Sequence, residues 1–302
     1  MIRALGIDLG ASGIRAFLEA TDSPAAAINR PATSANRESD VIELIENLAS
    51  ELQGGFESVC LGMSGYSSLG VDVEKVAESL SQAFQCPALV TSDMATGHYA
   101  HFGEDDGATV IVGTGALAFA VGNGKHARID GLGASVGDFG SAHWIGLTAL
   151  REAKRESELS GQSSLLQELE AALGRSHHWP KLFAKGEVST YEIAKLSQVV
   201  AKASATSDLA RDVLVRAGKL VAESAMACAA AVGVREVGYG GSVLLGTKVA
   251  EASFLKELGK TELYASPLRR SVGVGALGLA IAADSARASY LVDNQLAVRS
   301  RG

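Results

Sequence analysis

The sequence predicts an α/β protein of two domains with a cleft between them, because two local patterns each occur once in each half of the chain. Residues 5–18 and 110–121 both show a strand, a small-residue loop and a second strand, which is typical of a hairpin. Residues 58–67 and 236–245 both show a strand that runs into a turn of glycine and serine, with a helix nearby. The two pairs occur in the same order, and such an internal repeat indicates a duplicated fold.

Composition and charge limit the kinds of partner. The chain has 302 residues, of which 47% are hydrophobic and 20% charged, and this is enough for two domains and a large core. The net charge of −7 argues against nonspecific binding to nucleic acid or an anionic membrane, but it allows a local cationic phosphate site. The sequence starts directly with a strand pattern and contains no run of about 18 apolar residues, so we expect a cytoplasmic protein.

Cysteine and histidine spacing gives no sign of a metal centre. Cys60, Cys86 and Cys228 lie far apart and form no CxxC pair, which suggests neither a zinc site nor an iron–sulfur cluster. We expect buried free thiols in a reducing compartment. His177 and His178 are adjacent but have no second ligand cluster in view, so we expect them in a loop or an interface.

The first predicted elements are strands over residues 3–8 and 14–19, joined by the loop Leu9-Gly10-Ala11-Ser12-Gly13. In such a loop the backbone amides and the Ser12 hydroxyl can face an anion, while Asp8 holds a hydrated cation. An ordinary β-turn after a stray aspartate is the alternative.

The chain then continues with alternating elements. Polar residues 21–40 include two prolines and predict a loop, in which Asn36 fits turn chemistry. Apolar spacing predicts helices over residues 40–52 and 74–84, and strands over residues 58–63 and 88–91.

Asp93 follows the strand over residues 88–91, in Ser92-Asp93-Met94-Ala95, and precedes a predicted helix through His98 and His101. Ligands of open α/β sheets bind outside the carboxyl ends of strands, so Asp93 is a candidate functional residue. A helix N-cap aspartate is the alternative.

The second half opens with the most informative stretch. Two apolar runs, residues 108–112 and 116–121, flank the tight loop Gly113-Thr114-Gly115 and predict a hairpin. Two further glycine loops follow at residues 131–133 and 137–141. This stretch offers backbone amides for phosphate, a threonine hydroxyl and a carboxylate at a helix entrance, a combination that favours a phosphotransferase.

The remaining elements carry little chemistry. Spacing near 3.6 predicts helices over residues 141–159, 164–173, 190–203, 207–232, 244–258 and 272–290. Strands are predicted over residues 236–239 and 262–265, and the polar tail over residues 293–302 is expected to fray.

Five motifs together carry a resemblance. They are Gly6-Ile7-Asp8-Leu9-Gly10-Ala11-Ser12, Ser92-Asp93-Met94-Ala95, Gly113-Thr114-Gly115, Gly137-Asp138-Phe139-Gly140-Ser141 and Gly240-Gly241-Ser242. In this order they resemble the sugar-kinase, heat-shock-chaperone and actin superfamily, and within it the BadF/BadG/BcrA/BcrD-type ATPases, most closely the N-acetylglucosamine kinases. The resemblance implies two ribonuclease-H-like (actin-like ATPase) domains with an interdomain cleft. They would comprise residues 1–105 with 284–302, and residues 106–283 with a helical insertion.

The resemblance also implies a reaction and a role for each motif. ATP with Mg²⁺ would phosphorylate the 6-hydroxyl of N-acetylglucosamine, giving ADP and the 6-phosphate. Asp93 would take the proton from that hydroxyl as general base, and Asp8 would help bind Mg²⁺ through water. The nucleotide would be bound by Gly10, Ala11, Ser12, Thr114, Gly115, Gly240, Gly241 and Ser242. The sugar would be bound by Asn36, Ser64, Asp93, Ala116, Gly131, Gly133 and Asp138.

The chain departs from the family pattern near the sugar. Related kinases commonly carry Ser-Asn where this chain has Ala116 and Leu117, so any contact there comes from the backbone. Leu132 replaces a common tryptophan, and Phe139 replaces an acid or amide. A lost hydrogen bond costs about 1–3 kcal/mol, enough to change the preferred sugar without changing the reaction.

Alternative functions remain open from the sequence. The acceptor could be glucosamine or N-acetylmuramic acid instead. A non-kinase ATPase activator of the same family would need iron–sulfur cysteines, whose spacing is wrong here. A regulatory sugar sensor is disfavoured by the intact Asp93. Members of the family are often dimers, so we expect a homodimer.

Overall fold

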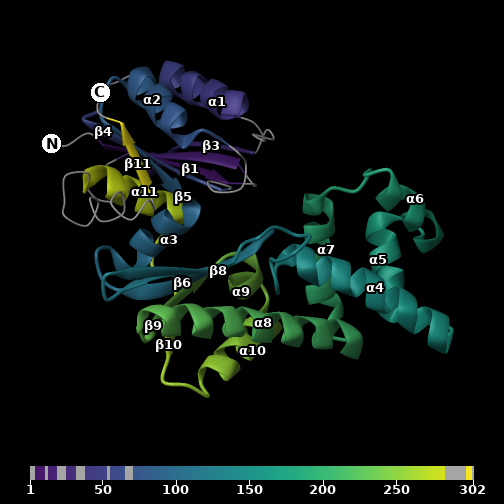
Figure 1. Ribbon diagram of the computed structural model, residues 1–302. Coiled ribbons are helices and arrows are strands. Elements are labelled where there is room, and N and C mark those ends of the chain that lie inside the picture. The colour runs from purple at the N-terminus through teal and green to yellow at the C-terminus, as the bar shows by residue number, and fades with distance from the viewer. Residues whose placement is uncertain are drawn as a thin grey trace. The chain divides into compact units, whose positions relative to one another are not determined.

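The computed structural model describes residues 4–10, 13–18, 25–31, 38–52, 55–64, 71–282 and 297–300. Three predicted site residues, Ala11, Ser12 and Asn36, lie outside these ranges. Contacts divide the chain into two units, one of Met1–Asp106 with Leu268–Gly302 and one of Gly107–Pro267. Each unit is an α/β structure built on one sheet (Figure 1), so the predicted class is confirmed.

Unit 1 contains a six-stranded sheet in the order β11-β5-β4-β1-β2-β3. The strands are β1 (Ala4–Gly10), β2 (Gly13–Leu18), β3 (Ala25–Pro31), β4 (Ser58–Met63), β5 (Ala88–Ser92) and β11 (Ala297–Ser300). Strands β1, β4 and β5 run parallel, whereas β2, β3 and β11 pair antiparallel with their neighbours. The carboxyl ends of the three parallel strands therefore lie at one edge of the sheet.

Helices cover both faces of this sheet. They are α1 (Glu38–Glu51), α2 (Val73–Phe84), α3 (Asp93–Phe102) and α11 (Val272–Ile281). Ile45 of α1 and Leu80 of α2 are buried in a cluster with Ile7 of β1. Leu277 of α11 is buried in another cluster, with Ala4 of β1. Because neighbouring strand residues face opposite sides of a sheet, these two clusters form two separate apolar layers.

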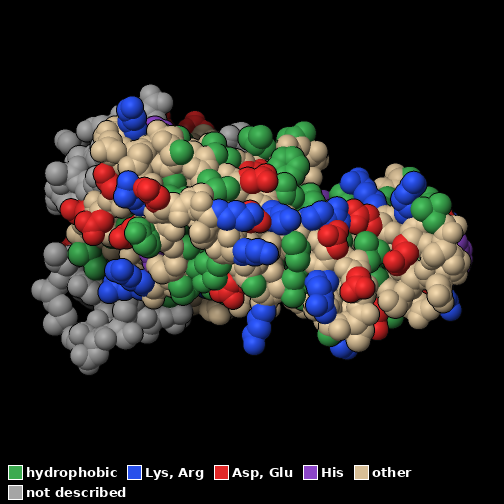
Figure 2. Space-filling view, turned by 90° about the horizontal axis from the view of Figure 1, so that it is seen from below, with side chains coloured by type: hydrophobic (Ala, Val, Ile, Leu, Met, Phe, Trp, Pro, Cys, Tyr) green, Lys and Arg blue, Asp and Glu red, His purple; other side chains and the backbone are tan. Residues whose placement is uncertain are grey.

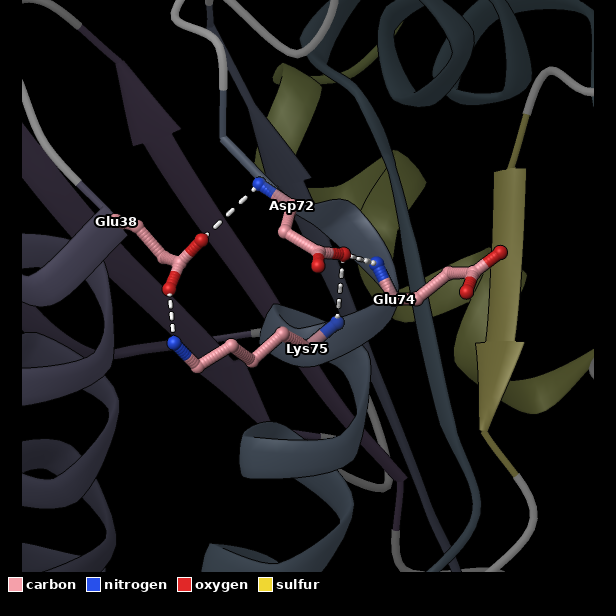
Figure 3. A network of polar contacts seen from close by, with 4 residues as sticks. All are labelled: Glu38, Asp72, Glu74 and Lys75. Atoms are coloured by element: carbon pink, nitrogen blue, oxygen red, sulfur yellow. Dashed lines mark hydrogen bonds and ion pairs between the residues drawn. The ribbon is translucent and has the colours of Figure 1, made fainter.

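A polar network fixes the start of α2 (Figure 3). Asp72 is the N-cap of α2, and its carboxylate accepts the backbone N–H groups of Glu74 and Lys75 at 3.1 and 3.2 Å. Glu38 at the start of α1 accepts the backbone N–H of Asp72 at 3.2 Å and is paired with the Lys75 ammonium. The network ties the first turn of α1 to the first turn of α2.

Three predictions for unit 1 need correction. Residues 25–31, within the expected loop 21–40, form β3, and the described part of the tail that was expected to fray, residues 297–300, forms β11, which pairs with β5. Helix α11 packs on β1 and β4, so the chain rejoins unit 1 from Leu268, earlier than the expected residue 284. The helix is described as far as Ile281, and its expected continuation to residue 290 lies outside the described residues. Strand β3 depends on pairing with the preceding strand β2, whereas β11 and α11 depend on strands far away in sequence.

Unit 2 contains a five-stranded sheet in the order β10-β9-β6-β7-β8. The strands are β6 (Gly107–Val112), β7 (Ala116–Gly122), β8 (Lys125–Asp130), β9 (Glu236–Gly240) and β10 (Tyr264–Pro267). Strand β8 is not among the strands predicted from the sequence, although the Asn-Gly pair before it is a hairpin signal. Asn123 and Gly124 both have positive φ, 52° and 69°, as a two-residue hairpin turn requires.

The helices of unit 2 are α4 (Ala142–Ser160), α5 (Ser164–Leu173), α6 (Trp179–Ala184), α7 (Thr190–Ala203), α8 (Asp208–Val232), α9 (Ser242–Gly246) and α10 (Lys248–Leu258). Four of them, α4, α5, α7 and α8, begin and end within one residue of their predicted bounds, whereas α6 was not predicted. Serine N-caps explain four of the starts, at Ser141, Ser163, Ser189 and Ser207. The helix predicted over residues 244–258 is instead divided, because Thr247 has an extended backbone between α9 and α10.

Surface charge is mixed on the face drawn in Figure 2, where Lys and Arg side chains lie among Asp and Glu. In unit 2, Arg216 pairs with two carboxylates, that of Glu152 at 2.5 Å and that of Asp212 at 2.8 Å. His177 and His178, which were expected in a loop or an interface, belong to a short 3-10 helix (Ser176–His178), and their ring planes are tilted by 45° at a centroid distance of 4.0 Å. No described helix combines the length and apolar character that crossing a bilayer demands.

Candidate active site

Three polar residues of unit 1 meet at the carboxyl ends of its parallel strands. Asp8 lies near the end of β1, Ser64 directly follows β4, and Asp93 follows β5 as the first residue of α3. The Ser64 hydroxyl donates to Asp93 Oδ2 at 2.6 Å, and the Ser64 backbone N–H donates to the carbonyl of Leu9 at 2.8 Å. The serine therefore holds the Asp93 carboxylate in one orientation and is itself anchored to β1.

Asp93 is not the N-cap of α3. Ser92 caps the helix, and its hydroxyl accepts the backbone N–H of Ala95 at 3.2 Å. Asp93 is thus placed in the first turn, where the helix dipole favours a carboxylate. Thr96, which belongs to no motif found in the sequence, donates its hydroxyl to the Asp93 carbonyl at 2.9 Å. A Cβ on Gly62 of β4 would lie only 2.7 Å from Thr96 Cγ2, so glycine there permits the close packing of α3 on β4.

Asp8 is almost completely buried, with 5% of its surface exposed. Burial raises its pKa to about 6, the neighbouring Arg15 guanidinium opposes this rise, and the charge of Asp93 adds to it. Arg15 Nε lies 3.6 Å from Asp8 Oδ2. Because one partly exposed arginine does not compensate the buried carboxylate, the site is suited to a further cation.

The donor set fits magnesium bound largely through water. Among the described residues no group of three or more His, Cys, Asp or Glu side chains could form a complete metal cage. Mg²⁺ is commonly held by one or two carboxylates together with water and substrate phosphates, and the Asp8 carboxylate matches that pattern. Gly10 is next to this cluster, since a Cβ there would lie 3.7 Å from Ser64 Oγ.

In unit 2, the hairpin between β6 and β7 is docked on the start of α4. The N–H of Ala142 donates to the carbonyl of Gly113 at 2.9 Å, and the N–H of His143 donates to the carbonyl of Thr114 at 3.2 Å. In a trans peptide the carbonyl and the N–H point in opposite directions. The N–H groups of Thr114 and Gly115 therefore point away from α4, in an arrangement that suits phosphate oxygens.

Asp138 braces this hairpin from the loop that precedes α4. Its backbone has positive φ, 57°, and its carboxylate accepts the N–H groups of Ala116 and Gly133. A Cβ on Gly115 would lie 2.9 Å from Asp138 Oδ2, so the brace requires glycine at that position. Burial raises the pKa of Asp138, and the two backbone hydrogen bonds partly offset the rise.

The loop over residues 131–139 needs unusual backbone conformations and exposes apolar side chains. Gly131 and Gly133 have φ of 70° and 85°. Leu132, Val136 and Phe139 are exposed by 68%, 69% and 47%.

The last motif, Gly240-Gly241-Ser242, lies at the same edge of the sheet as the hairpin loop, because β9 and β6 run parallel. Gly241 has φ of 93°, and a Cβ on it would lie 2.3 Å from the carbonyl oxygen of Val112. Only glycine fits this close approach of two backbones. Ser242 is the first residue of α9.

The predicted site residues thus form one group in each unit. Unit 1 brings together Asp8, Gly10, Ser64 and Asp93. Unit 2 brings the hairpin residues Thr114, Gly115 and Ala116 together with Asp138 and Gly133. Arg15, Thr96 and Asp130 are additional residues at these groups that the sequence analysis missed.

The two units, each a mixed sheet with helices, define a class of fold shared with sugar kinases. A candidate N-acetylglucosamine kinase from Chromobacterium violaceum has a TM-score of 0.66 at 22% identity, over 92% of this chain and 98% of that one. A candidate N-acetylglucosamine kinase from Porphyromonas gingivalis has a TM-score of 0.61 at 15% identity, over 98% and 100%. A ROK family glucokinase from Streptomyces griseus, solved with glucose and AMPPNP, has a TM-score of 0.60 at 18% identity, over 92% of this chain and 99% of that one.

The model of the BadF/BadG/BcrA/BcrD ATPase family matches residues 5–286, and the chain belongs to this family. Among curated protein sequences no match is found.

Proposed function

We propose that this protein is an ATP-dependent kinase that phosphorylates the 6-hydroxyl of N-acetylglucosamine. The observation that carries the proposal is the hydrogen bond between Ser64 and Asp93, with the buried Asp8 close by at the same strand ends. A carboxylate held by a serine is a suitable general base for a sugar hydroxyl. Family membership supports the use of ATP.

Each group of residues has a distinct part in this reaction. Asp93 accepts the proton of the attacking hydroxyl, and Ser64 keeps its carboxylate oriented. Asp8 would hold Mg²⁺ through water, and the ion supplies positive charge that neutralises the phosphates. The N–H groups of Thr114 and Gly115 donate to phosphate oxygens, and Gly240, Gly241 and Ser242 line the adenosine pocket. Positioning and charge neutralisation are the main requirements of phosphoryl transfer.

The loop over residues 131–139, which we propose to contact the sugar, favours an acceptor with a neutral N-acetyl group over one with the ammonium group of glucosamine. The carboxylate of Asp138 in the loop and that of Asp130 directly before it already accept backbone N–H groups. Its exposed large side chains, Leu132, Val136 and Phe139, are apolar. An ammonium group would have to share one of these carboxylates with its backbone donors, whereas an acetyl methyl group packs against apolar side chains.

The cysteines oppose the role of an iron–sulfur activator. Cys60, Cys86 and Cys228 are buried as free thiols. Burial raises the pKa of Cys86 to about 11 and that of Cys228 to about 12, and it also raises the pKa of Cys60. Cluster ligands are thiolates, which these environments disfavour.

The test is a panel of sugars with Mg-ATP, read out as ADP release with kcat/KM for each sugar. We expect the highest value for N-acetylglucosamine, with glucosamine and N-acetylmuramic acid below it. No stimulation by any sugar contradicts the kinase proposal. The same samples in size-exclusion chromatography test the homodimer that we propose.

Asp93→Asn tests the general base directly. We expect kcat to fall by about 10²–10⁴-fold while ATP still binds, because the amide cannot accept the proton. The control is Asp105→Asn, which removes an exposed carboxylate of the same unit. Full turnover by Asp93→Asn would exclude Asp93 as the base.

A further inference from the structure

Asp130, the last residue of β8, gathers three backbone donors on one side chain. Oδ1 accepts the N–H of Gly131 at 2.8 Å and that of Asp138 at 2.6 Å. Oδ2 accepts the N–H of Phe139 at 2.8 Å. The residue itself has positive φ, 67°, which is uncommon outside glycine. One carboxylate thereby joins the first residue of the loop over 131–139 to its last two residues.

The surrounding residues are shaped for this arrangement. A Cβ on Gly137 would lie 2.6 Å from Asp130 Oδ1, so any other residue there would displace the carboxylate. Arg128 Nη2 donates to the carbonyl of Gly131 at 2.6 Å and holds the same end of the loop. Hydrogen bonds to an ionised acceptor are stronger than neutral ones, so three of them hold the loop firmly.

The restraint is passed on to the hairpin through Asp138. The backbone N–H of Asp138 is bound by Asp130, and its carboxylate accepts the N–H groups of Ala116 and Gly133. The conformation of Asp138 is therefore determined at both its main chain and its side chain. Loss of the Asp130 carboxylate would remove the hydrogen bond to the backbone N–H of Asp138 and let Asp138 shift away from the hairpin.

We propose that Asp130 is a positioning residue that holds the loop over residues 131–139 in the shape in which it receives the sugar. The loop presents Leu132, Val136 and Phe139 to solvent, and such exposed apolar side chains can act as a recognition surface only if the backbone keeps them in place. The assignment of the ligand as a sugar rests on the proposed function. The role of Asp130 in ordering the loop does not.

Hydrogen exchange measured by mass spectrometry tests the ordering of the loop without any activity. In Asp130→Ala the amides of residues 131–139 should exchange at least about tenfold faster, because three hydrogen bonds are lost. In Asp130→Asn the rise should be smaller, because one side-chain oxygen still accepts. Glu168→Gln, at an exposed position of α5, is the matched control and should leave the loop unchanged. Equal exchange in Asp130→Ala and wild type overturns the proposal.

Steady-state kinetics test the consequence for the ligand. We expect Asp130→Ala to raise KM for the best sugar about tenfold while KM for ATP changes less than about twofold, since misplacement of a binding loop affects the ligand that it holds. In Asp130→Asn the increase in KM for the sugar should be smaller than in Asp130→Ala. Equal increases in both KM values overturn the sugar-loop role. If wild type phosphorylates no sugar, the proposed function fails, and the exchange experiment still decides whether Asp130 orders the loop.

Discussion

Replacement of Asp8 by asparagine should change how the stability of the metal-free protein depends on pH. The carboxyl is buried at the end of β1, and its pKa rises from 3.8 to about 6 on folding, mainly because burial disfavours the charged form. The folded state therefore binds the Asp8 proton more tightly than the unfolded chain does. The contribution of Asp8 to the stability of the folded state is fully present below about pH 4 and is lost as the pH rises through about 6. Asp8→Asn removes this titration and keeps the shape of the side chain.

The size of the effect follows from the two pKa values. Relative to the fully protonated state, the difference between the two pKa values lowers the free energy of unfolding of the wild-type protein by about 1 kcal/mol at pH 4.5 and about 3 kcal/mol at pH 7.5. The free energy of unfolding of Asp8→Asn, minus that of wild type, should therefore increase by about 2 kcal/mol over this interval. The Arg15 pair is partly exposed and opposes the rise only in part.

Urea unfolding in EDTA at several pH values between 4.5 and 7.5 measures this difference. Asp105→Asn serves as the control for the loss of one carboxylate from the same unit, at an exposed position. If the difference in free energy of unfolding between Asp8→Asn and wild type stays constant over the whole interval, burial does not raise the pKa of Asp8 as argued. Mg²⁺ added with ATP should stabilise wild type more than Asp8→Asn, because the bound ion compensates the buried charge.

Two further substitutions test local contacts. Ser64→Ala removes the 2.6 Å hydrogen bond to Asp93, so kcat should fall about 10–100-fold, and wild-type turnover would contradict an orienting role. Gly6→Ala should lower the free energy of unfolding by about 3 kcal/mol, since its Cβ would lie 2.2 Å from the backbone nitrogen of Leu277. Gly55→Ala, where nothing lies within 4 Å, is the control in the same urea experiment, and equal losses would argue against the close approach.

Predictions for the individual elements succeeded where the signal was local. Helices α5 and α7 have their expected bounds, because a serine cap and apolar spacing mark each of them. Strands β3 and β11 were missed, since their pairing partners β2 and β5 decide that they are strands. Strand β8 was missed despite the Asn-Gly turn before it, because its own residues are mostly polar and partly exposed.

The candidate site shows the same division. Asp93 could be singled out from the sequence because it follows an apolar strand and precedes a helix. The pairing of its carboxylate with Ser64, 29 residues away, required the parallel alignment of β4 and β5. Asp130 carried no motif, and its role became apparent only from three backbone donors that converge on it.

The sequence by itself determined the order of the main strands, glycine turns and helices, and from the motifs in that order the family. Those features depend on residues close to one another along the chain, which fix turns, caps and apolar faces. Only the tertiary structure decided which carboxylates are buried, which are held by a serine and which are taken up by backbone amides. Burial and hydrogen bonding depend on segments brought together by the sheets, such as β1 with β4 and β5, and no local pattern encodes them.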